Sequence, residues 1–151
     1  MMPPVVAWVD PGKMTGIARL WRDNFLAEEL PFDQAAWSLE NLCGSCGPVL
    51  AIGYERYKII PGVPQNHAHE AIEMIGVVKS AALRHGCRLL PPAWPGDRHT
   101  GSPDALRQLG WWVPGCDDAQ SAAQHLLAWL LRTGNLPPFV AEVIGTVGGP
   151  G

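Results

Sequence analysis

The sequence lacks any apolar run long enough to cross a lipid bilayer. A membrane-spanning helix needs about 20 consecutive apolar residues, and no stretch of this chain approaches that length. The N-terminus also lacks a basic segment followed by a cleavable apolar core. We therefore expect a cytoplasmic protein that does not bind membranes.

Charged residues are scarce, and they carry no excess of positive charge. Asp, Glu, Lys and Arg make up 17% of the 151 residues, and the net charge is −3. Apolar residues make up 47%, which is typical of a single globular domain with a real core. Bulk basicity is therefore absent, so a nucleic-acid partner would need a local positive surface.

Cysteine is rare, and its spacing does not indicate a zinc site. The chain has four cysteines, and only Cys43 and Cys46 form a close pair. A structural zinc site needs four ligands, and no second Cys or His pair has matching spacing near this one. Reduced thiols are the simpler interpretation.

Apolar periodicity predicts an α/β fold. The first three strands form an antiparallel meander, and two more strands alternate with helices. The predicted strands span residues 4–10, 16–22, 24–30, 48–54 and 87–90. The predicted helices span residues 32–42, 66–85, 103–109 and 118–131. This order predicts a mixed five-stranded sheet, a three-strand meander plus two parallel strands, with helices on both faces.

Two segments have little periodicity. Residues 93–102 are rich in Gly and Pro, so we expect a mobile loop. The tail over residues 135–151 is expected to be loose or docked on a partner subunit, which limits the predicted domain to residues 1–134.

Acidic residues stand where the predicted elements meet. Asp10 ends the first strand, Glu55 follows the fourth, and Asp117 and Asp118 begin the last helix. Carboxylates in such places can converge on divalent cations. Each also has a structural interpretation, because Asp10 lies in an Asp-Pro-Gly turn, Glu55 can be solvated, and an Asp caps helices well.

Taken in this order, the residues resemble the ribonuclease H fold and, within it, the RuvC-type Holliday junction resolvases. The resemblance rests on Asp10-Pro11-Gly12, on Tyr54-Glu55-Arg56 and on the acidic pair of the last helix. The segments EAIEMIG at 70–76, LGWW at 109–112 and AAQHLL at 122–127 look like RuvC-like enzymes encoded by phages of actinobacteria.

The resemblance implies a metal-dependent endonuclease that resolves four-way DNA junctions, with Asp10, Glu55 and Asp118 as catalytic residues. It implies two Mg²⁺ or Mn²⁺ ions per site, no nucleotide cofactor, and, if a phage encodes the chain, the cytoplasm of a bacterial host. Symmetric cleavage of a junction requires two sites related by a dyad, hence a homodimer. The helix over 66–85 is the expected interface, with candidates Ile72, Met74, Ile75 and Val78.

The chain departs from the family at two places. Ser121 stands where the family usually has an acidic metal ligand, so the fourth ligand is either Ser121 or the neighbouring Asp117. Lys58 replaces an aromatic residue that the family tends to place three residues after the strand Glu. The candidate DNA-binding residues are Lys13, Arg56, Tyr57, Lys58 and Arg98.

Other functions share this fold. A different nuclease, acting on RNA:DNA hybrids or on other branched DNA, would have the same carboxylates. A junction-binding protein with a weakened metal site is a further alternative, which Ser121 favours. A sugar kinase or actin-type ATPase is excluded because it needs two copies of the fold, and 151 residues cannot supply both.

Overall fold

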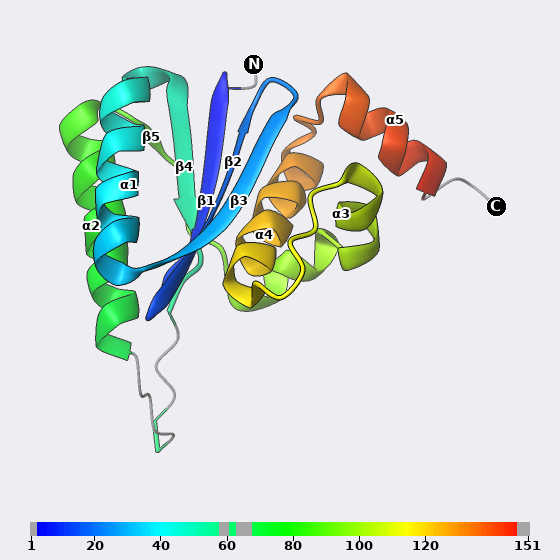
Figure 1. The fold of residues 1–151 in the computed structure, drawn as a ribbon. Helices are drawn as coiled ribbons and strands as arrows, with labels where there is room; N and C mark the ends of the chain where they lie inside the picture. The colour runs from blue at the N-terminus through cyan, green and yellow to red at the C-terminus, as the bar shows by residue number, and fades with distance from the viewer. Residues whose placement is uncertain (1–2, 58–60, 63–67, 148–151) are drawn as a thin grey trace.

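The central element is a five-stranded sheet with the strand order β3-β2-β1-β4-β5 (Figure 1). The computed structural model describes residues 3–57, 61–62 and 68–147. The strands are β1 (Val5–Asp10), β2 (Met14–Trp21), β3 (Asn24–Pro31), β4 (Leu50–Tyr54) and β5 (Arg88–Leu89). The first three pair antiparallel, while β4 is parallel to β1 and β5 is parallel to β4. This is the predicted mixed sheet.

Helices cover both faces of the sheet, as the sequence predicted (Figure 1). One face packs against α1 (Phe32–Cys46) and α2 (Ala68–His85), which contact each other. The other face packs against α4 (Asp117–Thr133), with α3 (Pro103–Leu109) and α5 (Pro138–Val147) outside it. A short 3-10 turn, η1 (Gly47–Val49), leads into β4.

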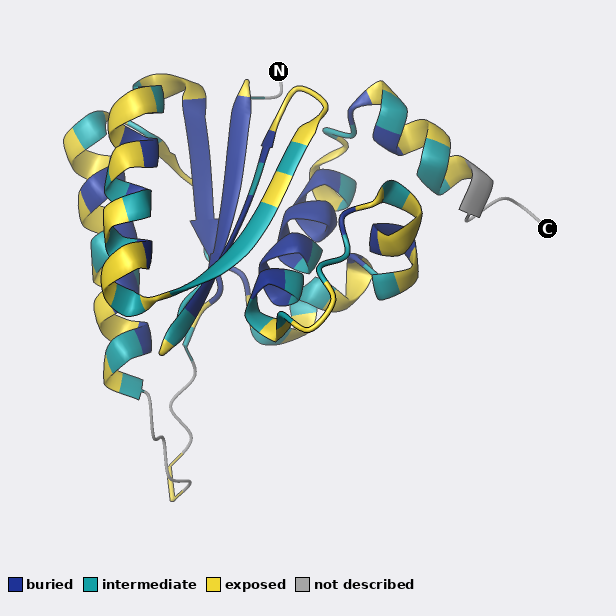
Figure 2. Ribbon diagram, viewed as in Figure 1, coloured by how far each residue is buried: buried dark blue, intermediate teal, exposed yellow. Residues whose placement is uncertain are grey.

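The middle of the sheet is buried from both sides. Residues of β1 and β4 are almost all buried, whereas β3 at the edge is partly exposed (Figure 2). Alternate residues of β1 therefore enter two different cores, as Trp8 packs under α4 while Val9 packs under α1 and α2. A near-continuous apolar run is what a strand covered on both faces requires.

The strand register places two of the candidate acids side by side. Val9 pairs with Tyr54 across β1 and β4, and the Glu55 backbone N–H donates to the Val9 carbonyl over 2.9 Å. Asp10 and Glu55 therefore leave the sheet at the same edge, on neighbouring strands, as predicted.

The segment over residues 93–102, expected to be a mobile loop, is instead a packed connection. Residues Pro95–Thr100 form a 3-10 helix, η2, that lies against α4. A Cβ on Gly101 would stand 2.2 Å from the Gln124 carbonyl oxygen, so glycine is needed for this close approach. The composition suggested mobility, but the glycine serves packing here.

The C-terminal segment, expected to be loose, also forms structure. Residues Pro138–Val147 form α5, which packs against α3, and Val140 is fully buried. Residues 148–151 of the predicted tail lie outside the described residues. The prediction of a loose tail was wrong. Among the α5 side chains whose burial the structure describes, only Val140 is buried, and a single buried position leaves a weak periodic signal.

The predicted interface residues of α2 divide into two groups. Met74 and Val78 are fully buried against the sheet, so they are unavailable to a partner. Ile75 is partly buried and Ile72 is 48% exposed. Leu83, which was not among the predicted interface residues, is 84% exposed, so the outward face of α2 keeps apolar surface. Among the described residues, no helix combines the length and apolar character needed to cross a membrane.

Candidate metal centre

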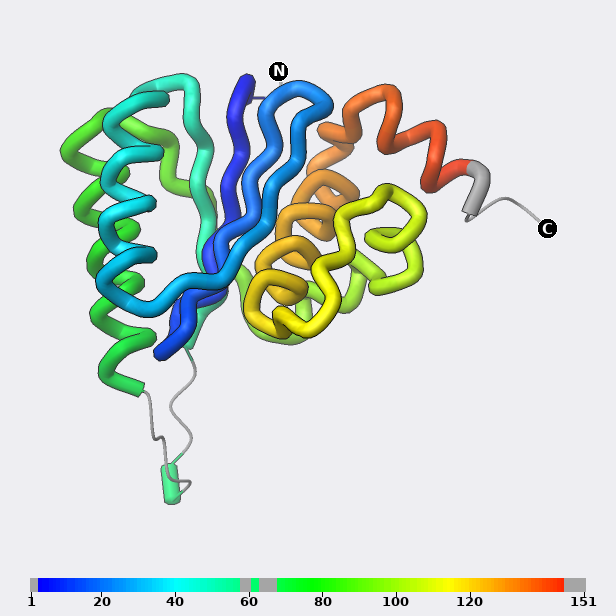
Figure 3. Tube along the Cα trace, in the orientation of Figure 1, coloured from blue at the N-terminus to red at the C-terminus, as the bar shows by residue number. Residues whose placement is uncertain are grey.

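The sheet edge and the start of α4 bring four predicted residues together. Asp10 ends β1, Glu55 directly follows β4, and Asp118 and Ser121 lie in the first turns of α4. The Ser121 Oγ donates to Glu55 Oε2 over 3.3 Å, and Ser121 also hydrogen-bonds the Asp10 carboxyl. Elements far apart in the chain thus meet here, as the tube in Figure 3 shows for α4 and the first strands.

A close backbone contact seats α4 on β2. A Cβ on Gly16 would stand 1.9 Å from the Asp118 carbonyl oxygen, so a larger residue would push the helix away. Gly16 pairs with Asp10 on one side and with Glu29 on the other. Beneath the start of α4, Gly16 therefore lies between two acidic residues on the neighbouring strands, Asp10 and Glu29.

Glu29 caps α4, a role that the sequence offered only as the structural alternative for Asp117 and Asp118. Glu29 Oε1 accepts hydrogen bonds from the backbone N–H of Asp118 at 3.1 Å and of Ala119 at 3.3 Å. The N-cap residue itself, Cys116, makes no side-chain capping bond, and the helix begins at Asp117. Sequence analysis missed Glu29 because only the β2–β3 register places it opposite Gly16.

The carboxylates change one another's ionisation. Burial, followed by the Glu55 carboxylate, raises the pKa of Asp10 to about 8, although a hydrogen bond from Ser121 opposes the shift. Burial also raises the pKa of Asp118, with further increases from Glu29, Asp117 and Glu55. Like charges brought together in this way favour either a shared proton or a bound cation.

Glu55 is held as an anion by a buried histidine. Burial alone would raise the pKa of Glu55, but the hydrogen bond and charge of His125, with a hydrogen bond from Asp10 and the charge of Arg98, together outweigh burial and lower the pKa. His125 Nε2 lies 3.1 Å from Glu55 Oε2, and its ring stacks on Trp8 at a centroid distance of 5.8 Å. His125 is thus packed against Trp8 and hydrogen-bonded to Glu55.

The acidic residues suit a hard cation, although they do not form a closed ligand cage. Three carboxylates and a hydroxyl are oxygen donors of the kind that Mg²⁺ and Mn²⁺ prefer. Within the part of the chain that the structure describes, no group of three or more His, Cys, Asp or Glu side chains is arranged to hold a metal ion.

The other predicted site residues lie at different distances from this centre. Arg98 of η2 places Nη1 3.8 Å from Glu55 Oε1, so it is part of the site. Lys13 and Asp117 are exposed, and Arg56 follows Glu55 with its guanidinium over the Trp94 ring at 4.7 Å. Tyr57 is half-buried beside Arg56, and Lys58 lies outside the described residues.

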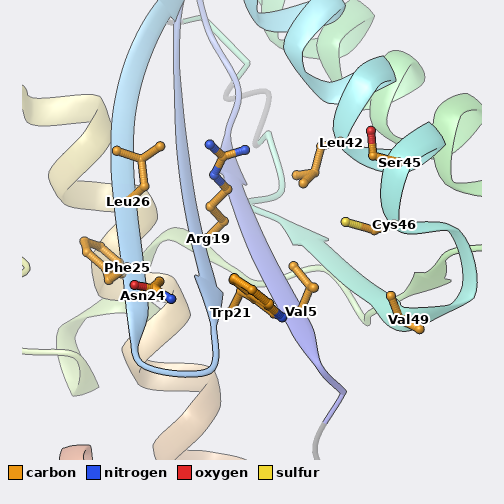
Figure 4. Close-up of a pocket in the computed structure, with 10 residues that line it drawn as sticks. All are labelled: Val5, Arg19, Trp21, Asn24, Phe25, Leu26, Leu42, Ser45, Cys46 and Val49. Atoms are coloured by element: carbon orange, nitrogen blue, oxygen red, sulfur yellow. The ribbon is translucent and has the colours of Figure 1, made fainter.

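An apolar hollow lies away from these carboxylates. It has a volume of about 480 Å³ and opens between α1 and the β2–β3 hairpin, lined by residues such as Val5, Trp21 and Leu26 (Figure 4). Val5 and Trp21 pair at the end of the sheet opposite Asp10. We therefore do not assign the hollow to the site.

The sheet order, the acids at the ends of β1 and β4, and the helix across them define the ribonuclease H-like fold. Among solved structures with a similar fold, two are RuvC proteins of Thermus thermophilus. One is RuvC in complex with a Holliday junction substrate, with a TM-score of 0.63, and the other is a RuvC structure with a TM-score of 0.55.

Each of these comparisons has 16% sequence identity and covers 86% of this chain and 96% of the other. No family model and no curated protein sequence matches the chain. The predicted resemblance therefore holds for the fold, over most of the chain.

Proposed function

We propose that the protein is a metal-dependent, structure-specific DNA endonuclease that resolves four-way junctions. The observation that carries the proposal is the meeting of Asp10, Glu55 and Asp118 at one edge of this fold. A structural neighbour was solved with a Holliday junction substrate, which supports branched DNA as the substrate class.

Asp10, Glu55 and Asp118 would hold two Mg²⁺ or Mn²⁺ ions, with Ser121 or Asp117 completing the site. Such ions supply an activated water and stabilise charge on the attacking and leaving oxygens of a phosphodiester. Asp10 holds a proton at neutral pH without a cation, because burial and Glu55 raise its pKa to about 8. His125 and Ser121 fix the Glu55 carboxylate, and Arg98 presents positive charge beside it.

Cleavage of a symmetric junction requires two such centres, so the proposal includes a homodimer. The exposed apolar side chains Ile72 and Leu83 on the outward face of α2 support an interface there. Because the net charge is −3, the DNA-binding surface would have to be a local positive one. The residues proposed for it are Lys13, Arg56, Tyr57, Lys58 and Arg98.

The decisive experiment compares a synthetic four-way junction with linear duplex and with an RNA:DNA hybrid. The wild type is expected to cut the junction in Mg²⁺ or Mn²⁺ and to leave both other substrates intact, while Asp10→Asn binds without cutting. Equal cutting of duplex or hybrid would favour another nuclease of this fold. Binding with no metal-dependent cutting would favour a junction-binding protein with a weakened site.

Substitution of Ser121 tests the ligand set. Ser121 is buried and donates to Glu55, so Ser121→Asp adds a fourth carboxylate facing Asp10 and Glu55. We expect a lower melting temperature in EDTA from charge repulsion, and a larger increase on adding Mg²⁺ than in the wild type. Ser121→Asn, which has nearly the same shape and no charge, is the matched control. Equal Mg²⁺-dependent increases for the Asp and Asn variants would place Ser121 outside the metal site.

A further inference from the structure

A second hollow lies at the same sheet edge as Glu55, on the side of α2. Its volume is about 440 Å³, and its lining is aromatic and basic. The residues that give it this character are Tyr54, Arg56, Tyr57, Lys79 and Trp94. None of the described residues that line it is acidic, although the chain as a whole has more acidic than basic residues.

Backbone hydrogen bonds join this hollow to the metal centre. The Ala93 N–H donates to the Tyr54 carbonyl at 3.0 Å, and the Arg56 N–H donates to the Ala93 carbonyl at 2.7 Å. Successive side chains of an extended segment point to opposite faces. Glu55 therefore faces α4, while Tyr54 and Arg56, its two neighbours, face the hollow.

The aromatic rings in the hollow are paired with cations. The Arg56 guanidinium lies 4.7 Å from the centre of the Trp94 ring, and Lys79 Nζ lies 5.9 Å from that of Tyr54. The Trp94 side chain is nevertheless 52% exposed. Its backbone is fixed, because the Trp94 N–H donates to Asp97 Oδ2 at 2.9 Å. An exposed indole on a fixed backbone is a preformed stacking surface.

We propose that this hollow binds one unstacked nucleobase of the DNA strand that enters the metal centre, an inference that rests on the proposed function. Every base has a π-face that can stack on an indole or a guanidinium, so the site takes a base of any identity. Lys79 and Arg56 supply positive charge in the lining of the hollow, which suits the phosphates on either side of that nucleotide. The base would be drawn out at the sheet edge, beside Glu55.

The test combines removal of the base with removal of the tryptophan. Binding of a four-way junction is measured by fluorescence anisotropy in EDTA, with a single abasic nucleotide placed in turn at each position within three of the crossover. Trp94→Ala is expected to weaken binding of the intact junction roughly 5- to 100-fold. At one position the abasic nucleotide should weaken wild-type binding similarly, without weakening Trp94→Ala further.

Trp21→Ala is the matched control. Trp21 is 49% exposed and has Arg22 at 5.1 Å from its ring centre, but it lies at the opposite end of the sheet. This variant should bind the intact junction and the abasic junctions as the wild type does. Arg56→Lys keeps the charge but loses the planar stacking group, so it should fall between the wild type and Trp94→Ala.

The outcomes separate this inference from the proposed function. If Trp94→Ala binds and cuts the intact junction as well as Trp21→Ala does, the base site is wrong while the nuclease stands. If the wild type neither binds nor cuts junctions, the proposed function fails, and the abasic scan is repeated on a single-stranded oligonucleotide. If an abasic nucleotide weakens binding of that oligonucleotide to the wild type but not to Trp94→Ala, the base site is supported. If no abasic position has this effect, the base site is overturned.

Discussion

When no cation is present, ionisation of Asp10 lowers the free energy of unfolding. Its pKa rises from 3.8 to about 8 through burial and the facing carboxylates Glu55 and Asp118, against a hydrogen bond from Ser121. Because the folded pKa lies above the unfolded one, the protonated group contributes stability that is fully present below the lower value. That stability is lost as the pH rises towards about 8.

Asp10→Asn removes this dependence. In EDTA at pH 8.5 the variant is expected to melt roughly 3–6 °C above the wild type, as a gain of 1–2 kcal/mol would produce, with little difference at pH 4.5. Differential scanning calorimetry at the two pH values measures this. Asp104→Asn, whose side chain is 87% exposed, controls for a general loss of negative charge. A difference in melting temperature that is equal at both pH values would contradict the prediction.

The sequence alone locates Asp10, Glu55 and Asp118, because strand ends and helix starts are visible in apolar periodicity. The bonds that fix them are not visible in the same way. Glu29 reaches α4 across 89 residues of chain, and Ser121 and His125 reach Glu55 across 66 and 70. Such contacts depend on strand register and helix rotation, which periodicity does not determine.

At the scale of elements, the placement of Asp118 depends on how α4 is seated against the sheet. Glu29 satisfies two backbone donors at the helix start, where the helix dipole favours a negative charge. Gly16 allows the backbone to approach from the neighbouring strand. The strand pair β2–β3 therefore positions the helix on which Asp118, a proposed metal ligand, lies.

Glu29→Ala should disturb this seating. We expect about 0.5–2 kcal/mol lower stability, as for the loss of other helix caps, together with weaker Mg²⁺ binding as Asp118 moves. Glu29→Gln keeps an acceptor oxygen and should restore most of the stability. Urea unfolding and Mg²⁺ titration by calorimetry measure the two effects.

Glu28→Ala is the control, since Glu28 is next in the strand and lines a hollow beside α1. It should change neither quantity appreciably. Equal losses for the two alanine variants would show that the capping bonds do not position Asp118.

Elements were predictable in proportion to the regularity of their apolar pattern. The strands and α2 and α4 have long periodic stretches, and their predicted bounds agree closely with the structure. Both η2 and α5 were missed, because Gly101 packs through a missing side chain, and Val140 is the one buried residue among the α5 side chains whose burial the structure describes. Neither a glycine that allows close backbone contact nor a single buried side chain produces a periodic apolar pattern in the sequence.

At the scale of the whole molecule, α5 extends the core beyond the sheet. Val140 shares a buried cluster with Trp111, whose ring also meets Phe139 edge-on at 6.3 Å. Trp111 stacks on Phe25 at the start of β3, with centroids 4.4 Å apart. The C-terminal helix is thus tied through one tryptophan to the far end of the strand that supplies Glu29.

Because α5 reaches the core at the end of the sheet opposite Asp10, we expect its contribution to stability to be separable from the proposed cleavage activity. Val140→Ala removes two buried methyl groups and leaves a cavity, so it should lower the free energy of unfolding by about 1–3 kcal/mol. Junction cutting by the folded fraction should be unchanged. Urea unfolding with an unchanged m-value measures the first effect, and single-turnover cleavage at low temperature measures the second.

Val49→Ala provides the comparison, because Val49 is 45% exposed and its truncation should cost no more than about 0.5 kcal/mol. If Val140→Ala were as mild as Val49→Ala, α5 would contribute nothing to the core, as the sequence-based expectation of a loose tail requires. If Val140→Ala instead reduced cutting by fully folded protein, the core beyond the sheet and the metal centre would be coupled through β3 and Glu29. The two measurements together therefore decide whether the packing of α5 affects only the stability of the fold or also the geometry of the proposed metal centre.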